Sequence, residues 1–176
     1  FVAYGNSTTA LGFVSSDINL KLGENDQENT YSGNLSLFDF DIGKLFRLEP
    51  AVGRVSMKAH LTGKGFELKH LDANVEGTAS RFDLYGYSYT GITVNGHLAK
   101  RFFNGDLGVE DPNLDFDFQG DVDLREALPE YNFTATVNKA HPVELHLLNR
   151  DTSSEVSGEA TINLIGNNID NAQGTV

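Results

Sequence analysis

The sequence contains no cysteine and no tryptophan, and it has only one methionine and four prolines among 176 residues. Without cysteine, neither a disulfide-stapled small domain nor a thiolate metal site can form. No uninterrupted apolar stretch in the sequence approaches the roughly 20 residues that a membrane-spanning helix needs. These absences exclude several classes of protein but are compatible with either an exported or a cytosolic location.

Positive charge is scarce as well. Lys and Arg number 13 against 25 Asp and Glu, so the formal net charge is −12 and the isoelectric point lies near 4.6. A surface with this excess repels nucleic acid and anionic headgroups, so we expect no nucleic acid partner. No leader peptide is visible, and the chain begins and ends within strand-like patterns. We therefore expect residues 1–176 to form a single segment of a longer protein.

The dominant pattern is a strict alternation of apolar and polar residues. From Leu114 to Leu124 the even positions are apolar or glycine, and the odd positions are Asp or Gln. Side chains alternate across a strand, so this stretch predicts a ribbon with one apolar face and one acidic face. The pattern recurs from Ala51 onward, and glycines return every nine or ten residues. Because a strand with its turn has about that length, the sequence predicts about twelve strands.

One segment breaks the alternation. Ile42, Leu45, Phe46 and Leu48 have helical spacing, and Pro50 ends the run. The spacing predicts one short helix near residues 41–48, which could plug one end of a sheet.

Two further local predictions concern strands. The alternation slips by one residue after Leu37, which predicts a bulge or break after which Phe38 and Phe40 share the apolar face. Near the C-terminus, the spacing of Val143, Leu145 and Leu147 predicts an additional strand.

We interpret the fold as all-β: an elongated curled single sheet, or half-pipe, with a hydrophobic groove. The alternative is a β-sandwich or a closed barrel. Sandwich strands average about five or six residues, whereas the apolar faces here are longer and their reverse sides are too polar to bury a second core. The side chains expected to line the groove lie on these apolar faces: Val55, Met57, Leu61, Leu71, Val75, Leu114, Phe116, Phe118, Val122, Phe133, Val137, Ile162 and Leu164.

A calcium-loop spacing occurs within this pattern. Residues from Asp115 to Glu126 nearly match an EF-hand loop, including Gly120 at its sixth position. An EF-hand needs a helix on each side, but Pro112 precedes the stretch and Pro129 follows it. The sequence therefore predicts a solvated acidic face and no metal site.

No pattern of catalytic residues is present. The histidines lack the helical pairing of a zinc protease and are expected on strand surfaces. There is no nucleophile elbow, and Gly63-Lys64-Gly65 is too short for a phosphate loop. We expect neither an enzyme nor a bound cofactor.

Several ordered segments resemble the TamB family of translocation and assembly proteins, within the AsmA-like superfamily, and most closely its Bacteroidota-type branch. The similarity covers about residues 30 to 176. The segments that carry it are the glycine, turn and strand patterns of Leu45–Gly53, Tyr89–Gly96, Phe102–Leu124, Pro129–Ala135 and Asn163–Asp170.

The resemblance implies a periplasmic segment with the curled architecture called a β-taco, from a protein anchored in the inner membrane by a helix outside this segment. It implies an outer-membrane barrel of the Omp85 class (TamA-like) as partner. It further implies that the hydrophobic groove is a conduit or chaperone for phospholipid or for nascent outer-membrane protein strands.

A function of a different class is an extracellular adhesin or glycan-binding β-domain. Tyr85, Tyr87 and Tyr89 would be its exposed anchors.

Overall fold

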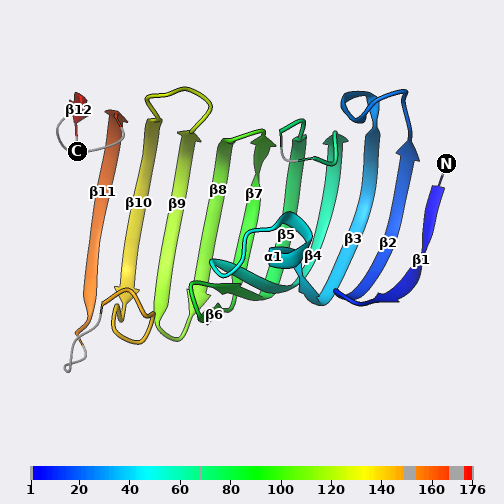
Figure 1. The fold of residues 1–176 in the computed structure, drawn as a ribbon. Helices are drawn as coiled ribbons and strands as arrows, with labels where there is room; N and C mark the ends of the chain where they lie inside the picture. The colour runs from blue at the N-terminus through cyan, green and yellow to red at the C-terminus, as the bar shows by residue number, and fades with distance from the viewer. Residues whose placement is uncertain (1, 68, 149–153, 167–172, 176) are drawn as a thin grey trace.

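The computed structural model describes residues 2–67, 69–148, 154–166 and 173–175. Twelve strands form one antiparallel sheet in the order β1-β2-β3-β4-β5-β7-β8-β9-β10-β11-β12, and β6 pairs with β5 (Figure 1). The elements are β1 (Val2–Thr9), β2 (Gly12–Lys21), η1 (Asp26–Glu28), β3 (Thr30–Asp41), α1 (Ile42–Phe46), β4 (Val52–Lys64), β5 (Asp72–Leu84), β6 (Tyr87–Tyr89), β7 (Ile92–Ala99), β8 (Phe102–Asp111), β9 (Leu114–Asp123), β10 (Glu130–Ala140), β11 (Val156–Ile165) and β12 (Gln173–Thr175).

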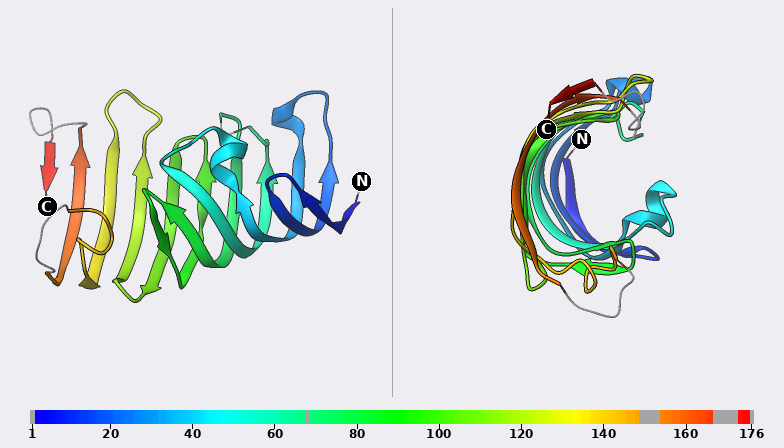
Figure 2. Two further views of the ribbon diagram at one scale, coloured as in Figure 1. Left: turned by 60° about the horizontal axis from the view of Figure 1, so that its bottom comes forward. Right: turned by 90° about the vertical axis from the view of Figure 1, so that its left-hand side faces the viewer.

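The sheet curls into an open half-pipe. Figure 2 shows the strands bending into a C when the molecule is viewed along the strand order, with α1 at the open side. The hollow of the C therefore runs across the strands, from the β1 end towards the β12 end. The predicted curled single sheet is confirmed, and the alternative of a sandwich or closed barrel is wrong.

The predicted short helix is confirmed as α1. Asp41 caps its N-terminus: the carboxylate accepts a hydrogen bond from the Lys44 backbone N–H at 2.9 Å and pairs with Lys44 Nζ at 2.8 Å. Arg47 ends the helix in a left-handed conformation. Gly43 lies so close to β4 that a Cβ there would overlap the carbonyl oxygen of Val52. The helix therefore packs directly on the start of β4.

The predicted slip in β3 is a bulge, but its consequence differs from the prediction. The register to β4 shifts between Leu37 and Phe40, and Asp39 has a φ of 47°. Phe40 is 8% exposed and Phe38 is 67% exposed, so the two rings do not share a face. The extra residue at the bulge returns only Phe40 to the apolar side.

The predicted strand at Val143 to Leu147 is wrong, because this segment forms successive turns. Backbone hydrogen bonds run from the N–H of Leu145 to the His141 carbonyl and from the N–H of Leu147 to the Pro142 carbonyl. The segment thus satisfies its backbone hydrogen bonds locally. Of its three apolar residues, Leu145 is buried, at 1% exposure.

Candidate functional site: an apolar groove

Apolar side chains continue from strand to strand across the concave face. The pairing registers join one residue per strand into a central row that is entirely apolar or glycine: Ile18, Gly33, Leu61, Val75, Gly96, Gly105, Gly120, Phe133 and Ile162. Two positions along each strand lies a parallel row: Leu35, Ala59, Gly77, Val94, Leu107, Phe118, Ala135 and Ala160. The apolar surface is therefore continuous along the groove.

Burial identifies this face as the inner one. In β4 and β5, Ala59 and Ala73 are buried, at 6% and 4% exposure. The next residue along each strand, His60 or Asn74, is exposed. Because side chains crowd on the concave side of a curled sheet and splay apart on its convex side, the apolar rows line the hollow of the C.

Twelve of the thirteen predicted lining residues lie on this apolar face, by strand alternation and register, and Leu71 lies in the connection just before β5. Among all thirteen, Val55 is buried, at 2% exposure, and it lies in β4, the strand that α1 contacts. The remaining twelve, Leu71 included, are half-buried. A dry closed core would bury them fully, so most of the lining is accessible from the open side of the groove.

The outer face is polar along its central rows. One row reads Asp17, Asn34, His60, Glu76, Asn95, Asp106, Gln119, Thr134 and Thr161. Neighbouring side chains along these rows are joined by hydrogen bonds, such as Gln119 to Asp106 at 2.9 Å. The stretch with calcium-loop spacing runs along β9 and the bends after it, and the Asn138 amide donates to Asp115 at 2.9 Å. This segment has the conformation of a strand and not of a chelating loop.

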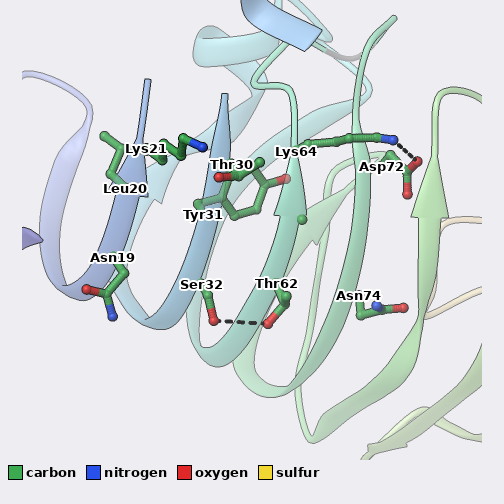
Figure 3. Close-up of a pocket in the computed structure, with 11 residues that line it drawn as sticks. Asn19, Leu20, Lys21, Thr30, Tyr31, Ser32, Thr62, Lys64, Asp72 and Asn74 are labelled. Atoms are coloured by element: carbon green, nitrogen blue, oxygen red, sulfur yellow. Dashed lines mark hydrogen bonds and ion pairs between the residues drawn. The ribbon is translucent and has the colours of Figure 1, made fainter. Parts of the chain in front are cut away.

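Surface hollows also occur between polar rows of the outer face. One of them, about 770 Å³, is bordered by β2, β3, β4 and β5. Figure 3 shows its side chains, including the ion pair of Lys64 with Asp72 at 3.2 Å and the contact of Ser32 with Thr62 at 3.3 Å. A second hollow of about 620 Å³ borders the exposed rings of Phe13 and Phe38.

At the rim drawn uppermost in Figure 1, Asp26 joins two connections that are distant in sequence. Its carboxylate accepts hydrogen bonds from the backbone N–H groups of Phe66 and Glu67, at 3.0 and 3.2 Å, and lies 3.0 Å from His70 Nδ1. The bond from Phe66, with those from Glu67, His70 and Asn29, outweighs the opposing effect of burial and lowers the pKa of Asp26 to about 2.

Asp26, Glu67 and His70 are the one group in the described part of the chain with donor atoms close enough to hold a metal ion. Sequence reasoning missed this group because 44 residues separate Asp26 from His70. However, the Asp26 oxygens already accept several donors, and Glu67 pairs with Lys69 at 2.7 Å. The arrangement accounts for loop anchoring without a metal.

At the opposite rim, Asp111 organises a second network. It is 4% exposed and accepts hydrogen bonds from the Tyr87 hydroxyl, the Asn113 N–H, and the Thr90 hydroxyl and N–H, at 2.5 to 2.9 Å. Burial alone would raise the pKa of Asp111, but these bonds outweigh it and lower the pKa below its ordinary value. The network fixes the β5–β6 hairpin to the β8–β9 turn.

This network bears on the predicted tyrosine anchors. Tyr85 is 70% exposed, but Tyr87 and Tyr89 are half-buried, with ring centroids 4.7 Å apart. The predicted exposure of all three tyrosines is therefore wrong for two of them.

Only two of the five histidines lie on strand surfaces as predicted, namely His60 and His97. His70, His141 and His146 lie in connecting segments.

The geometry defines an open, curled, single-sheet protein with an apolar groove and a polar exterior. No known protein family matches the sequence, and comparisons with characterised proteins and with solved structures find no match either. In the described part of the chain, no helix is long and apolar enough to cross a membrane.

Proposed function

We propose that this chain is a periplasmic segment of a TamB-like envelope-biogenesis protein whose groove carries the acyl chains of phospholipid between the inner and outer membranes. The observation that carries the proposal is the continuous apolar floor, most of which remains partly exposed along the strand order. Extended apolar surfaces of this kind are rare on proteins without a ligand or partner, because leaving them in water is costly.

The chemistry of a phospholipid fits this arrangement. Each buried CH₂ of an acyl chain contributes about 0.8 kcal/mol, so a floor of aliphatic and aromatic side chains can hold the chain. The open side of the C leaves room for the headgroup to remain in water. The role needs no catalytic group, which agrees with an apolar lining from Val55 to Leu164.

A nascent strand of an outer-membrane protein is the second candidate cargo. Among the described residues β1 pairs only with β2, so its other edge offers unpaired backbone groups to a client strand. An outer-membrane barrel of the Omp85 class is the corresponding partner. Glycan binding is less well supported, because Asp111 holds the Tyr87 hydroxyl in the rim network.

Two adjacent positions test the groove. Phe118 lies on the apolar face and Gln119 on the polar one. With a photo-crosslinking residue at each position in cells, we expect capture of phospholipid or a client strand at position 118 and of neither at position 119. Phe118→Asp should impair transport because a carboxylate in the apolar path must be desolvated or bring in water, whereas Gln119→Asp should be nearly silent.

The control is the fold itself. Phe118→Asp protein must remain soluble and resist proteolysis as the unmodified chain does. If the crosslinker at position 118 captures no lipid and no strand while the protein is folded, the conduit proposal is wrong.

A further inference from the structure

Two phenylalanine rings adjoin on the outer face of the sheet, among polar side chains. Phe13 of β2 and Phe38 of β3 are direct register partners, and they are 36% and 67% exposed. We call these two residues the aromatic pair. Single apolar side chains on a protein surface are ordinary, but two neighbouring rings on a polar face form a small apolar platform.

The bulge in β3 adjoins this platform. It turns Phe40 to the inner face and leaves Phe38 on the outer one. Between them the backbone of Asp39 is fixed on both sides: its N–H donates to Ser56 Oγ at 2.9 Å, and its carbonyl oxygen accepts from the Arg54 guanidinium at 2.6 Å. Bulges are frequent next to functional sites, where they set the direction of a side chain.

A row of hydrogen-bond donors lies beside the aromatic pair. The strand registers place Ser36, Lys58 and Thr78 side by side on β3, β4 and β5. Ser36 is two positions from Phe38 along β3 and therefore on the same face. We call Ser36, Lys58 and Thr78 the donor row. In the described part of the chain none of their side chains has a hydrogen-bond or ion-pair partner, so two hydroxyls and one ammonium group remain available.

The aromatic pair and the donor row border the same hollow, of about 620 Å³, a volume typical of small-ligand sites. The described lining of this hollow contains no Asp or Glu. Other hollows of the outer face each border a carboxylate, from Asp72, Glu76, Asp106 or Asp117. Because Lys58 is the one charged side chain in the described lining, the site is complementary to a negatively charged group.

We propose that this hollow binds an acidic saccharide, a sugar ring that carries an anionic group. The inference goes beyond the lipid function and does not depend on it, and the tyrosines of the β5–β6 hairpin take no part. A sugar ring has an apolar face of C–H groups that can lie on the aromatic pair, and its hydroxyls can pair with Ser36 and Thr78. Its anionic group can pair with the Lys58 ammonium. A lipid chain would match the rings but leave the donor row unpaired.

The test is a titration of the whole chain, with the NMR shifts of backbone amides in β2 to β5 as the signal. The probes are methyl glucuronide and glucose phosphate as anionic sugars, methyl glucoside as a neutral sugar, and acetate. We expect at least one anionic sugar to bind roughly tenfold more tightly than methyl glucoside, because it gains a hydrogen bond between charged groups. Acetate should bind at least as weakly as methyl glucoside, because it has no ring to lie on the aromatic pair.

Two variants separate the rings from the charge. Phe38→Ala should weaken the binding of every sugar roughly tenfold. Lys58→Gln should weaken the anionic sugars roughly tenfold and change methyl glucoside binding less than about twofold. Both side chains are exposed, so we expect both variants to fold. Tyr85→Ala and Lys21→Gln replace an exposed ring and an exposed lysine outside the hollow, and as matched controls they should alter no affinity.

Three results would overturn the inference. The first is acetate binding as tightly as the anionic sugars, which would show that the charge acts without the rings. The second is a folded Phe38→Ala protein that keeps the unmodified affinity for every sugar. The third is the absence of shifts in β2 to β5 with all the sugars. The lipid conduit would stand in each case, because crosslinking at position 118 tests it separately.

Discussion

Single residues of this sheet have very different tolerance to change, even where their sequence context is the same. Gly120 and Gly158 both lie at inner positions of long strands. Gly120 has a φ of +142°, and a Cβ there would overlap the Asn132 carbonyl oxygen. At Gly158 a Cβ would meet nothing within 4 Å, and no positive φ is required.

We predict that Gly120→Ala destabilises the protein by about 1–3 kcal/mol, the typical cost of forcing a side chain into such a conformation. Gly158→Ala should be neutral or stabilising by less than about 1 kcal/mol, because it lowers the entropy of the unfolded chain. Urea denaturation of both variants measures the difference. Equal midpoints for the two variants would show that the close approach at Gly120 is not a real constraint.

A pH effect is predicted at Asp26. The folded-state pKa of about 2 lies below the ordinary value of 3.8, so the ionised form is stabilised by folding. This contribution is fully present above the ordinary pKa and is lost as the pH falls towards 2. The stability difference between the unmodified protein and Asp26→Asn should therefore be constant from pH 7 to about 5 and shrink at lower pH.

Thermal denaturation over that pH range measures the effect, and Asp121→Asn on the outer face of β9 is the matched control. A stability difference for Asp26→Asn that stays unchanged down to pH 2 would contradict the role given to the Asp26 hydrogen bonds.

Among the elements, α1 depends on a single cap and on one strand. It has five residues, too few for a stable isolated helix. Its described contacts are with β4, and Asp41 satisfies the Lys44 N–H. The element therefore forms only because the end of β3 and the start of β4 hold it in place.

We predict that Asp41→Ala loosens α1 and leaves the sheet intact. Hydrogen exchange should accelerate at the backbone N–H of Lys44 and Leu48, while protection in β8 to β10 stays unchanged. The thermal midpoint should fall by roughly 2–4 °C, as expected for the loss of one N-cap in a chain of this size. Lys44→Ala is the matched variant, since it removes the ion pair at the surface but keeps the cap. If both substitutions accelerated exchange equally, the ion pair and not the cap would be the determinant.

At the scale of the whole molecule, contacts are local in the strand order. The extensive contacts between strands all join sheet neighbours, from β1 with β2 to β11 with β12. No second layer packs on the described sheet. Such an arrangement resembles a linear array, in which each unit is stabilised by its neighbours and units at the ends have fewer of them.

We predict a gradient of amide protection along the sheet order. Protection should be highest in β4 and β5, which have the longest paired neighbours, and lowest in β1 and β12, which each pair on one side only. Hydrogen exchange with mass spectrometry measures it. Uniform protection over all strands would indicate a single cooperative unit and contradict the linear description.

The sequence by itself determined the class of fold and the two faces of the sheet. Strict alternation, as in Leu114 to Leu124, fixes which side chains share a face, because side chains alternate along any strand. The helical spacing before Pro50 likewise predicted α1. These signals are local, and so they survive in the sequence without knowledge of the fold.

Only the tertiary structure decided what depends on residues distant in the chain. The direction in which Phe38 points follows from the bulge, where the Asp39 N–H donates to Ser56 Oγ and the Arg54 guanidinium donates to the carbonyl and carboxylate oxygens of Asp39. Leu145 is buried although it lies in a segment of turns, where the alternation of the sequence predicted a strand. The rings of Phe103, Phe118 and Phe133 come into contact through strand register, which no local pattern encodes. Curling the sheet, in turn, made one apolar face into a groove, because a single layer can reduce the exposure of its apolar face only by bending around it.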